Sequence, residues 1–89
     1  RSQRGTTPKR HTIEMVNFEF RPAVVRVAAG DTVIWINRDV VPHTATAQGA
    51  WETGNIGSQE TGRVIVKGSG EQNYVCEYHS SMRGKLIVK

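Results

Sequence analysis

The feature that most constrains the fold is a succession of short β-type runs separated by turn residues. β-Branched and aromatic residues gather in short groups, several of which alternate with polar residues, and glycine or proline falls between the groups. No segment repeats apolar residues at the three-to-four-residue spacing of an amphipathic helix. A chain of 89 residues fits one domain. The sequence therefore predicts a single all-β sandwich or barrel.

The strands can be placed by composition and alternation. The clearest is Thr32–Asn37, which follows a Gly-Asp turn signal and is rich in β-branched and aromatic residues. In the segment 73–78, alternation places Tyr74, Cys76 and Tyr78 on one face. The polar, glycine-bearing segment 49–59 is expected to be a loop. The other expected strands are residues 11–16, 18–20, 24–28, 44–47, 63–67 and 84–89.

The positive charge is unevenly distributed along the chain. The formal net charge is +4, and the first ten residues contain Arg1, Arg4, Lys9 and Arg10 without any acidic residue. We therefore expect residues 1–10 to form a flexible basic tail or linker and residues 11–89 to form the folded domain. Four scattered charges attract nucleic acid only weakly, so no nucleic-acid partner is predicted. The sequence has no apolar run long enough to cross a membrane.

The single cysteine lies in a motif that carries metal-ligand chemistry. One cysteine excludes an intramolecular disulfide framework. Cys76, His79 and Met82 form the pattern C-x-x-H-x-x-M between two expected strands, and together they offer a thiolate, an imidazole and a thioether. Soft sulfur ligands beside nitrogen favour copper. A second histidine would complete the His₂Cys set with a weak axial methionine that holds blue copper. The candidate is His43, which follows Pro42.

Each of these residues also has an ordinary interpretation when taken alone. A lone cysteine is usually a small buried apolar residue, a lone histidine is usually no ligand, and a lone methionine usually fills a core. The combination and its spacing favour a metal site over these alternatives. His11 has no potential ligand nearby in the sequence and is not assigned to the site, and Trp35 and Trp51 are expected to pack in the core.

At these residues the chain resembles the cupredoxin family of the plastocyanin and amicyanin kind. Residues 18–47 (FEFRPAVVRVAAGDTVIWINRDVVPHTATA) are similar to the family's segment that leads to the first copper histidine. Residues 76–88 (CEYHSSMRGKLIV) are similar to its copper loop and last strand, and the short loop is typical of amicyanins. The resemblance implies a cupredoxin-like Greek-key sandwich or barrel of about seven to eight strands. It also implies one type 1 copper ion, with His43, Cys76 and His79 as strong ligands and Met82 as the weak axial ligand.

Three positions depart from the family pattern. Thr44 stands where the family commonly has asparagine, and its hydroxyl can supply part of the hydrogen bonding to the cysteine loop. Tyr78 and Ser80 stand on either side of His79, where amicyanins have proline. These differences leave the four ligands intact but bear on loop rigidity and redox potential, because contacts around the ligands tune both.

Four protein ligands leave no open position for a hydrolytic or oxygen-activating metal, so the motif predicts an electron carrier and no enzyme. Copper would cycle between Cu(I) and Cu(II). The resemblance to cupredoxins implies that electrons pass through the exposed edge of His79, within an apolar patch. By resemblance, we expect transient redox partners such as a c-type cytochrome or a dehydrogenase, a monomer, and a periplasmic or otherwise extracytoplasmic location. A membrane tether would require an upstream anchor. Two alternatives remain open: a copper carrier or sensor domain, and a zinc-binding or metal-free β-sandwich used for protein binding.

Overall fold

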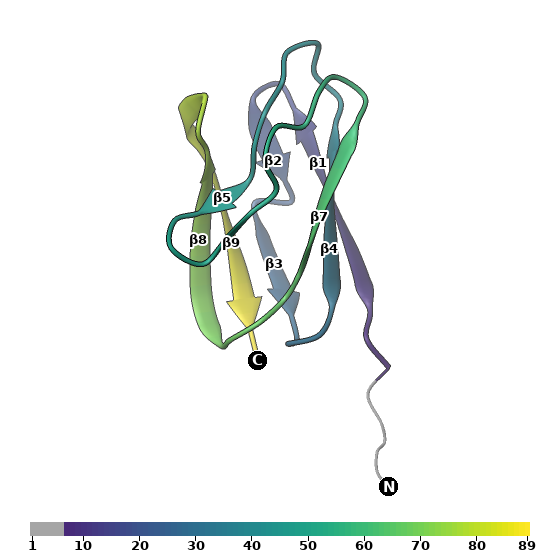
Figure 1. Ribbon diagram of the computed structural model, residues 1–89, viewed down its shortest axis with the longest axis vertical. Coiled ribbons are helices and arrows are strands. Elements are labelled where there is room, and N and C mark those ends of the chain that lie inside the picture. The colour runs from purple at the N-terminus through teal and green to yellow at the C-terminus, as the bar shows by residue number, and fades with distance from the viewer. Residues whose placement is uncertain (1–6) are drawn as a thin grey trace, which may run out of the picture.

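The fold consists of two β-sheets packed face to face (Figure 1). A computed structural model describes residues 7–89, and no helix occurs among them. The all-β prediction is thereby confirmed. The strands are β1 (Arg10–Val16), β2 (Glu19–Arg21), β3 (Val24–Val27), β4 (Thr32–Asn37), β5 (Thr46–Ala47), β6 (Trp51–Glu52), β7 (Thr61–Ile65), β8 (Gly70–Cys76) and β9 (His79–Val88).

The order of the strands joins segments that are distant in the sequence. The first sheet has the order β2-β1-β4-β7 and the second has the order β3-β9-β8-β5-β6. The pairs β1–β4 and β3–β9 are parallel, and the other neighbouring pairs are antiparallel. The last strand, β9, is therefore an internal strand with β3 on one side and β8 on the other. This position fixes the β8–β9 hairpin, which carries three of the four expected ligands.

The hairpin differs from the sequence prediction in one respect that affects the site. The last strand begins at His79 rather than at residue 84, because Cys76 pairs with His79 across a two-residue turn. The alternation of β8 ends at this turn. The prediction that Tyr78 shares one face with Tyr74 and Cys76 is therefore wrong, since Tyr74 and Cys76 are buried and Tyr78 is exposed. The short strand β6 lies in the segment expected to be a loop.

The core contains a cluster of aromatic rings between the sheets. The centroids of Trp35, Trp51 and Tyr74 lie 5.4 to 5.5 Å from one another, and Phe20 lies 4.7 Å from Tyr74. These rings confirm the packing role expected for both tryptophans. Gly84 lies directly beside the Tyr74 ring, and a Cβ atom at position 84 would overlap the phenol.

We therefore expect Gly84→Ala to destabilise the fold by about 1–3 kcal/mol, the usual cost of overpacking a core. Urea unfolding followed by tryptophan fluorescence measures this change. Gly57→Ala is the matched control, because a Cβ there meets only the flexible side chain of Glu60. Equal unfolding midpoints for the two variants would contradict the close approach at Gly84.

The N-terminal end of β1 is joined to the fold through Asp31. Its carboxylate accepts hydrogen bonds from the backbone N–H groups of Lys9 and Ala28 and from Nε2 of His11, at 2.8 to 3.0 Å. The hydrogen bond from Lys9, followed by those from His11 and Ala28, lowers the pKa of Asp31 to about 2. Residues 1–6 of the expected tail lie outside the described residues, and the boundary after residue 10 stays a prediction. In the structure, β1 already begins at Arg10.

The lowered pKa of Asp31 predicts a loss of stability in acid. The ordinary pKa of an aspartate is 3.8, so the stabilisation is complete above this pH and is lost as the pH falls toward about 2. We expect Asp31→Asn to cost about 1–3 kcal/mol at pH 7 and to flatten the pH dependence between pH 4 and 2. Urea midpoints measured across this range test the prediction. Glu19→Gln, at an exposed surface pair, serves as the control. A wild-type acid dependence in Asp31→Asn would contradict the assignment.

Candidate metal centre

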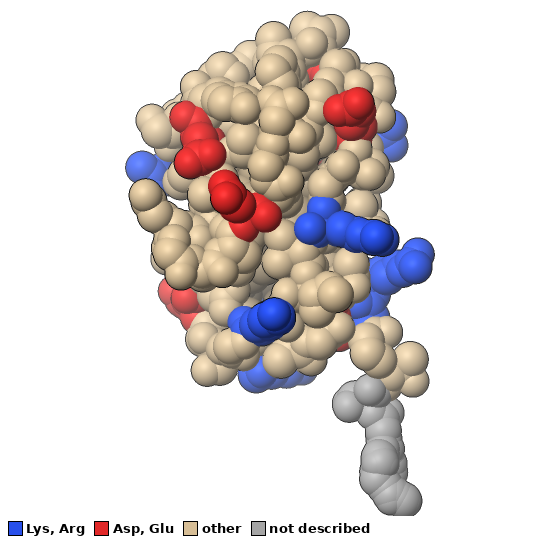
Figure 2. All heavy atoms as spheres, in the orientation of Figure 1, with Lys and Arg blue, Asp and Glu red and all other residues tan. Residues whose placement is uncertain are grey.

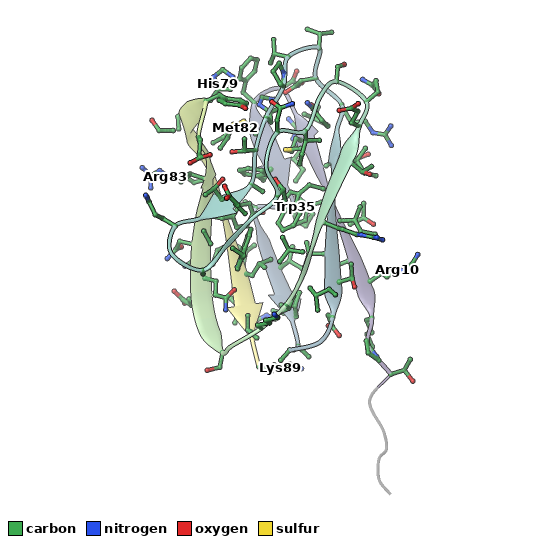
Figure 3. The ribbon with its side chains drawn as sticks, viewed as in Figure 1. Arg10, Trp35, His79, Met82, Arg83 and Lys89 are labelled. Carbon is green, nitrogen blue, oxygen red and sulfur yellow. The ribbon has the colours of Figure 1, made fainter. Side chains whose placement is uncertain are left out.

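Two of the predicted ligand residues, His79 and Met82, lie toward the end of the sandwich opposite Arg10 and Lys89 (Figure 3). His43 lies between β4 and β5, Cys76 ends β8, and His79 and Met82 belong to β9. Figure 3 shows Met82 below His79, toward the interior of the sandwich. His43, Cys76 and Met82 are buried, whereas His79 is partly exposed.

The closest approach within the site is between His43 and Cys76. Nδ1 of His43 lies 3.7 Å from Sγ of Cys76, although the two residues are 33 positions apart in the sequence. The ring centroids of His43 and His79 are 5.3 Å apart. Within residues 7–89, no three His, Cys, Asp or Glu side chains stand close enough to form an assembled metal cluster. The structure thus brings the two histidines and the thiol into one neighbourhood. Met82 follows His79 by three residues on β9 and is buried.

His43 is held by its backbone and by the far side of its ring. Its N–H donates to the carbonyl of Ile56 at 3.0 Å, and its carbonyl accepts from the N–H of Ile56 at 2.8 Å. Nε2 of the ring donates to Oδ2 of Asp39 at 2.8 Å. This hydrogen bond selects the tautomer in which Nδ1 carries a lone pair facing Cys76. The arrangement is typical of histidine ligands, whose second nitrogen usually donates to a carboxylate or carbonyl.

Asp39 also accepts two hydrogen bonds from the turn between β1 and β2. Backbone N–H groups of Asn17 and Phe18 donate to its two carboxylate oxygens at 2.8 and 2.9 Å. Burial acts to raise the pKa of Asp39, but the hydrogen bonds from Phe18, His43 and Asn17 outweigh it and lower the pKa. The side chain therefore remains a carboxylate that accepts from all three groups.

Thr44 connects the two halves of the site around the thiol. Its backbone N–H donates to Sγ of Cys76 at 3.4 Å, and its hydroxyl accepts from the N–H of Glu77 at 2.8 Å. The Thr44 hydroxyl also shares a hydrogen bond of 3.2 Å with that of Thr46. The structure thus shows Thr44 bonding to the cysteine loop, as expected from its position after His43.

Sequence reasoning missed Asp39, Asn17 and Phe18. The ring of Phe18 packs edge-on against both His79 and His43, with centroid distances of 4.7 and 5.3 Å. Asn17 carries one weak signal, since asparagine tolerates the positive φ of hairpin turns. The contacts of Asp39 and Phe18 depend on the approach of the β1–β2 turn to His43. No local sequence pattern predicts this approach.

The donors in this neighbourhood fit a copper ion. They combine a buried thiol, an imidazole nitrogen free to bind metal and a thioether, which are the donors of a type 1 copper site. A β-sandwich with such a site at one end defines the class of blue copper proteins. Comparison with known proteins bears this out, since the family model of the "Cupredoxin-like domain" matches residues 2–88. The chain belongs to the cupredoxin family.

Amicyanins are among the proteins that this chain is similar to. Amicyanin-alpha of Methylorubrum extorquens is 26% identical over 83 residues, covering 86% of this chain and 70% of the relative. Amicyanin of Paracoccus versutus is 33% identical over 75 residues, covering 73% of this chain and 54% of the relative. A solved structure of the Cu(I) form of an amicyanin variant has a TM-score of 0.80 and 25% identity, covering 89% of this chain and 81% of the other. The chain is thus a cupredoxin of the amicyanin kind, the class of type 1 copper proteins that bind one copper ion and carry electrons rather than act as enzymes.

The bridging role of Thr44 predicts different effects of two substitutions at this position. Thr44→Val removes the acceptor of the partly buried hydrogen bond from the N–H of Glu77, so we expect a loss of about 1 kcal/mol in unfolding free energy. We also expect faster hydrogen exchange of the Glu77 amide. Thr44→Ser retains the hydroxyl and should restore most of both properties. Thr61→Val, at an exposed position, is the control. Unchanged exchange of the Glu77 amide in Thr44→Val would show that the hydroxyl does not hold the loop.

Proposed function

We propose that His43, Cys76, His79 and Met82 hold one copper ion and that the chain carries single electrons between redox partners. The contact of 3.7 Å between Nδ1 of His43 and Sγ of Cys76 carries this proposal, because it places a free imidazole nitrogen beside the only thiol of the chain. A copper ion bound by these residues would alternate between Cu(I) and Cu(II).

Two of the proposed ligands, His43 and Cys76, are buried and held by hydrogen bonds. Two backbone hydrogen bonds to Ile56 and the side-chain bond to Asp39 hold His43, and the N–H of Thr44 is directed at the Cys76 sulfur. A ligand pair held in this way changes little between two oxidation states, which suits electron transfer. Four protein ligands leave no position for a substrate, in agreement with a carrier function.

The test is the visible absorption spectrum of the copper-loaded protein. We expect an intense blue charge-transfer band in the wild type and its complete loss in Cys76→Ala, because the band needs the thiolate ligand. Met82→Leu should shift the spectrum and the potential. Met15→Leu, at a methionine buried elsewhere in the core, should alter neither. Absence of the band in the wild type would refute the copper assignment, and a blue protein that exchanges electrons very slowly would favour a copper carrier instead.

The exposed surface beside His79 is suited to brief contact with another redox protein. Three large apolar side chains remain exposed: Phe18, Val40 and Tyr78. The ring of Phe18 contacts that of His79, Tyr78 precedes His79 in the sequence, and Val40 follows Asp39. In the view of Figure 2 the uppermost end carries few charges, whereas Lys and Arg gather mainly in the lower half. Electron-transfer complexes are commonly small and weak, so a limited apolar surface around a partly exposed ligand is sufficient.

We propose a c-type cytochrome or a dehydrogenase as the partner, and a monomer that works in the periplasm or another extracytoplasmic compartment. The amicyanin relatives support the redox role and this kind of location. No helix within residues 7–89 is long and apolar enough to span a membrane. We propose no nucleic-acid partner, because residues 11–89 are formally neutral.

A charge placed on the apolar surface should slow electron exchange without changing the site. We expect Val40→Glu to lower the rate of electron self-exchange by on the order of tenfold, because two like charges meet when two copies dock through this surface. Line broadening in NMR spectra of mixed oxidation states measures the rate. Ile65→Glu, at an exposed residue of β7 near the other end of the sandwich, is the control. Equal rates for the two variants would place the electron-exchange surface elsewhere.

A further inference from the structure

We propose that Phe18 is a positioning residue for the copper site: its ring restrains the imidazole rings of His79 and His43, and Asp39 anchors the turn that holds it. The inference rests on the proposed role of both histidines as ligands. It adds a residue from the β1–β2 turn, which belongs to the other sheet from the hairpin that carries His79.

The three rings form one cluster with edge-on contacts. Phe18 lies 4.7 Å from His79 at an interplanar angle of 77° and 5.3 Å from His43 at 79°. The two imidazoles lie 5.3 Å apart at 75°. Edge-on pairs at these distances are the favoured geometry of aromatic contacts, and each restricts rotation of both rings. Phe18 therefore contacts two proposed ligands at once.

The backbone at Phe18 indicates that this position is held in place. Asn17 and Phe18 form the two-residue turn between β1 and β2, with φ angles of 53° and 61°. Asparagine and glycine tolerate such angles, whereas a bulky residue adopts them at a cost. Strain of this kind persists only where the surroundings impose it, and it often marks functional sites.

The turn is imposed by the same carboxylate that orients His43. Oδ1 of Asp39 accepts from the N–H of Asn17 at 2.8 Å, and Oδ2 accepts from the N–H of Phe18 at 2.9 Å. The same Oδ2 accepts from Nε2 of His43 at 2.8 Å. One side chain thus sets the orientation of the first histidine and the position of the ring that packs on the second.

The loop around His79 gives a reason why a restraint from outside is needed. Tyr78 and Ser80 flank His79, and neither fixes its backbone φ as proline would. The hydroxyl of Tyr78 donates a hydrogen bond to the side chain of Asn55. This bond restrains the side chain of Tyr78 and does not act on the imidazole of His79. The ring contact with Phe18 acts on the imidazole itself.

A simpler interpretation is that Phe18 is only part of the docking surface, since 46% of it is exposed. That interpretation predicts an effect on electron transfer with a partner but none on His79 in the isolated chain. The two interpretations therefore differ in the metal-free protein, where neither copper nor a partner is present.

The experiment is NMR of the imidazole groups in the metal-free full chain. We expect Phe18→Leu to raise the population of other His79 ring orientations about 2- to 12-fold, the range expected for losing one aromatic pair. It should also remove the ring-current shifts of both imidazoles. Phe18→Tyr keeps the ring and should behave as the wild type. Val24→Ala, at a valine of similar exposure (51%) on β3, is the control.

Imidazole resonances and relaxation in Phe18→Leu that match those of the wild type would overturn the proposal. Asp39→Asn tests the anchor: it should shift the Phe18 ring resonances together with those of His43, and unchanged Phe18 resonances would overturn the anchoring role. Failure of the copper function is a separate result, because a wild-type chain without a blue band could still show the Phe18 effect.

Discussion

The site depends on the buried contact between His43 and Cys76. It joins the segment after β4 in one sheet to the end of β8 in the other, so neither residue can move without disturbing the packing between the sheets. The neighbouring hydrogen bonds all act on this pair: Ile56 holds the His43 backbone, Asp39 turns its Nδ1 toward the thiol, and Thr44 directs an N–H at the sulfur. The β-sandwich provides the rigidity, and these few polar contacts convert it into a defined arrangement of metal ligands.

The sequence was sufficient for the parts of this arrangement that are local. Strand β4 follows from its composition and the turn signal before it, and the C-terminal part of β8 follows from alternation. The motif C-x-x-H-x-x-M places Cys76, His79 and Met82 at intervals of three residues. Alternation failed at Tyr78 because it assumes that a strand continues, whereas pairing between Cys76 and His79 closes the hairpin there. The start of β9 was misplaced for the same reason. A pairing partner determines where a strand begins, and composition does not report the partner.

The contacts that position the ligands are tertiary and were not predictable. In the sequence alone, Asp39 is an acidic residue after a strand and Phe18 is an aromatic residue in a β-type run. Neither pattern indicates a role at the site. They acquire a role only because the parallel pairing of β1 with β4 brings the β1–β2 turn beside the segment that leads to His43. Identifying them from sequence would require the register of that pairing, which follows from the packing of the whole first sheet.

A comparison of Asp31 with Asp39 shows what distinguishes a structural histidine from a ligand in this fold. The two carboxylates lie on either side of β4, and each accepts two backbone N–H groups from neighbouring segments and one histidine Nε2. The hydrogen-bond pattern alone therefore cannot identify the metal site. His11 is partly exposed and no sulfur donor faces it within the described structure, whereas His43 is fully buried and its second nitrogen faces Cys76. The same set of hydrogen bonds secures a strand end at the partly exposed His11 and orients a proposed ligand at His43, whose second nitrogen lies beside a thiol.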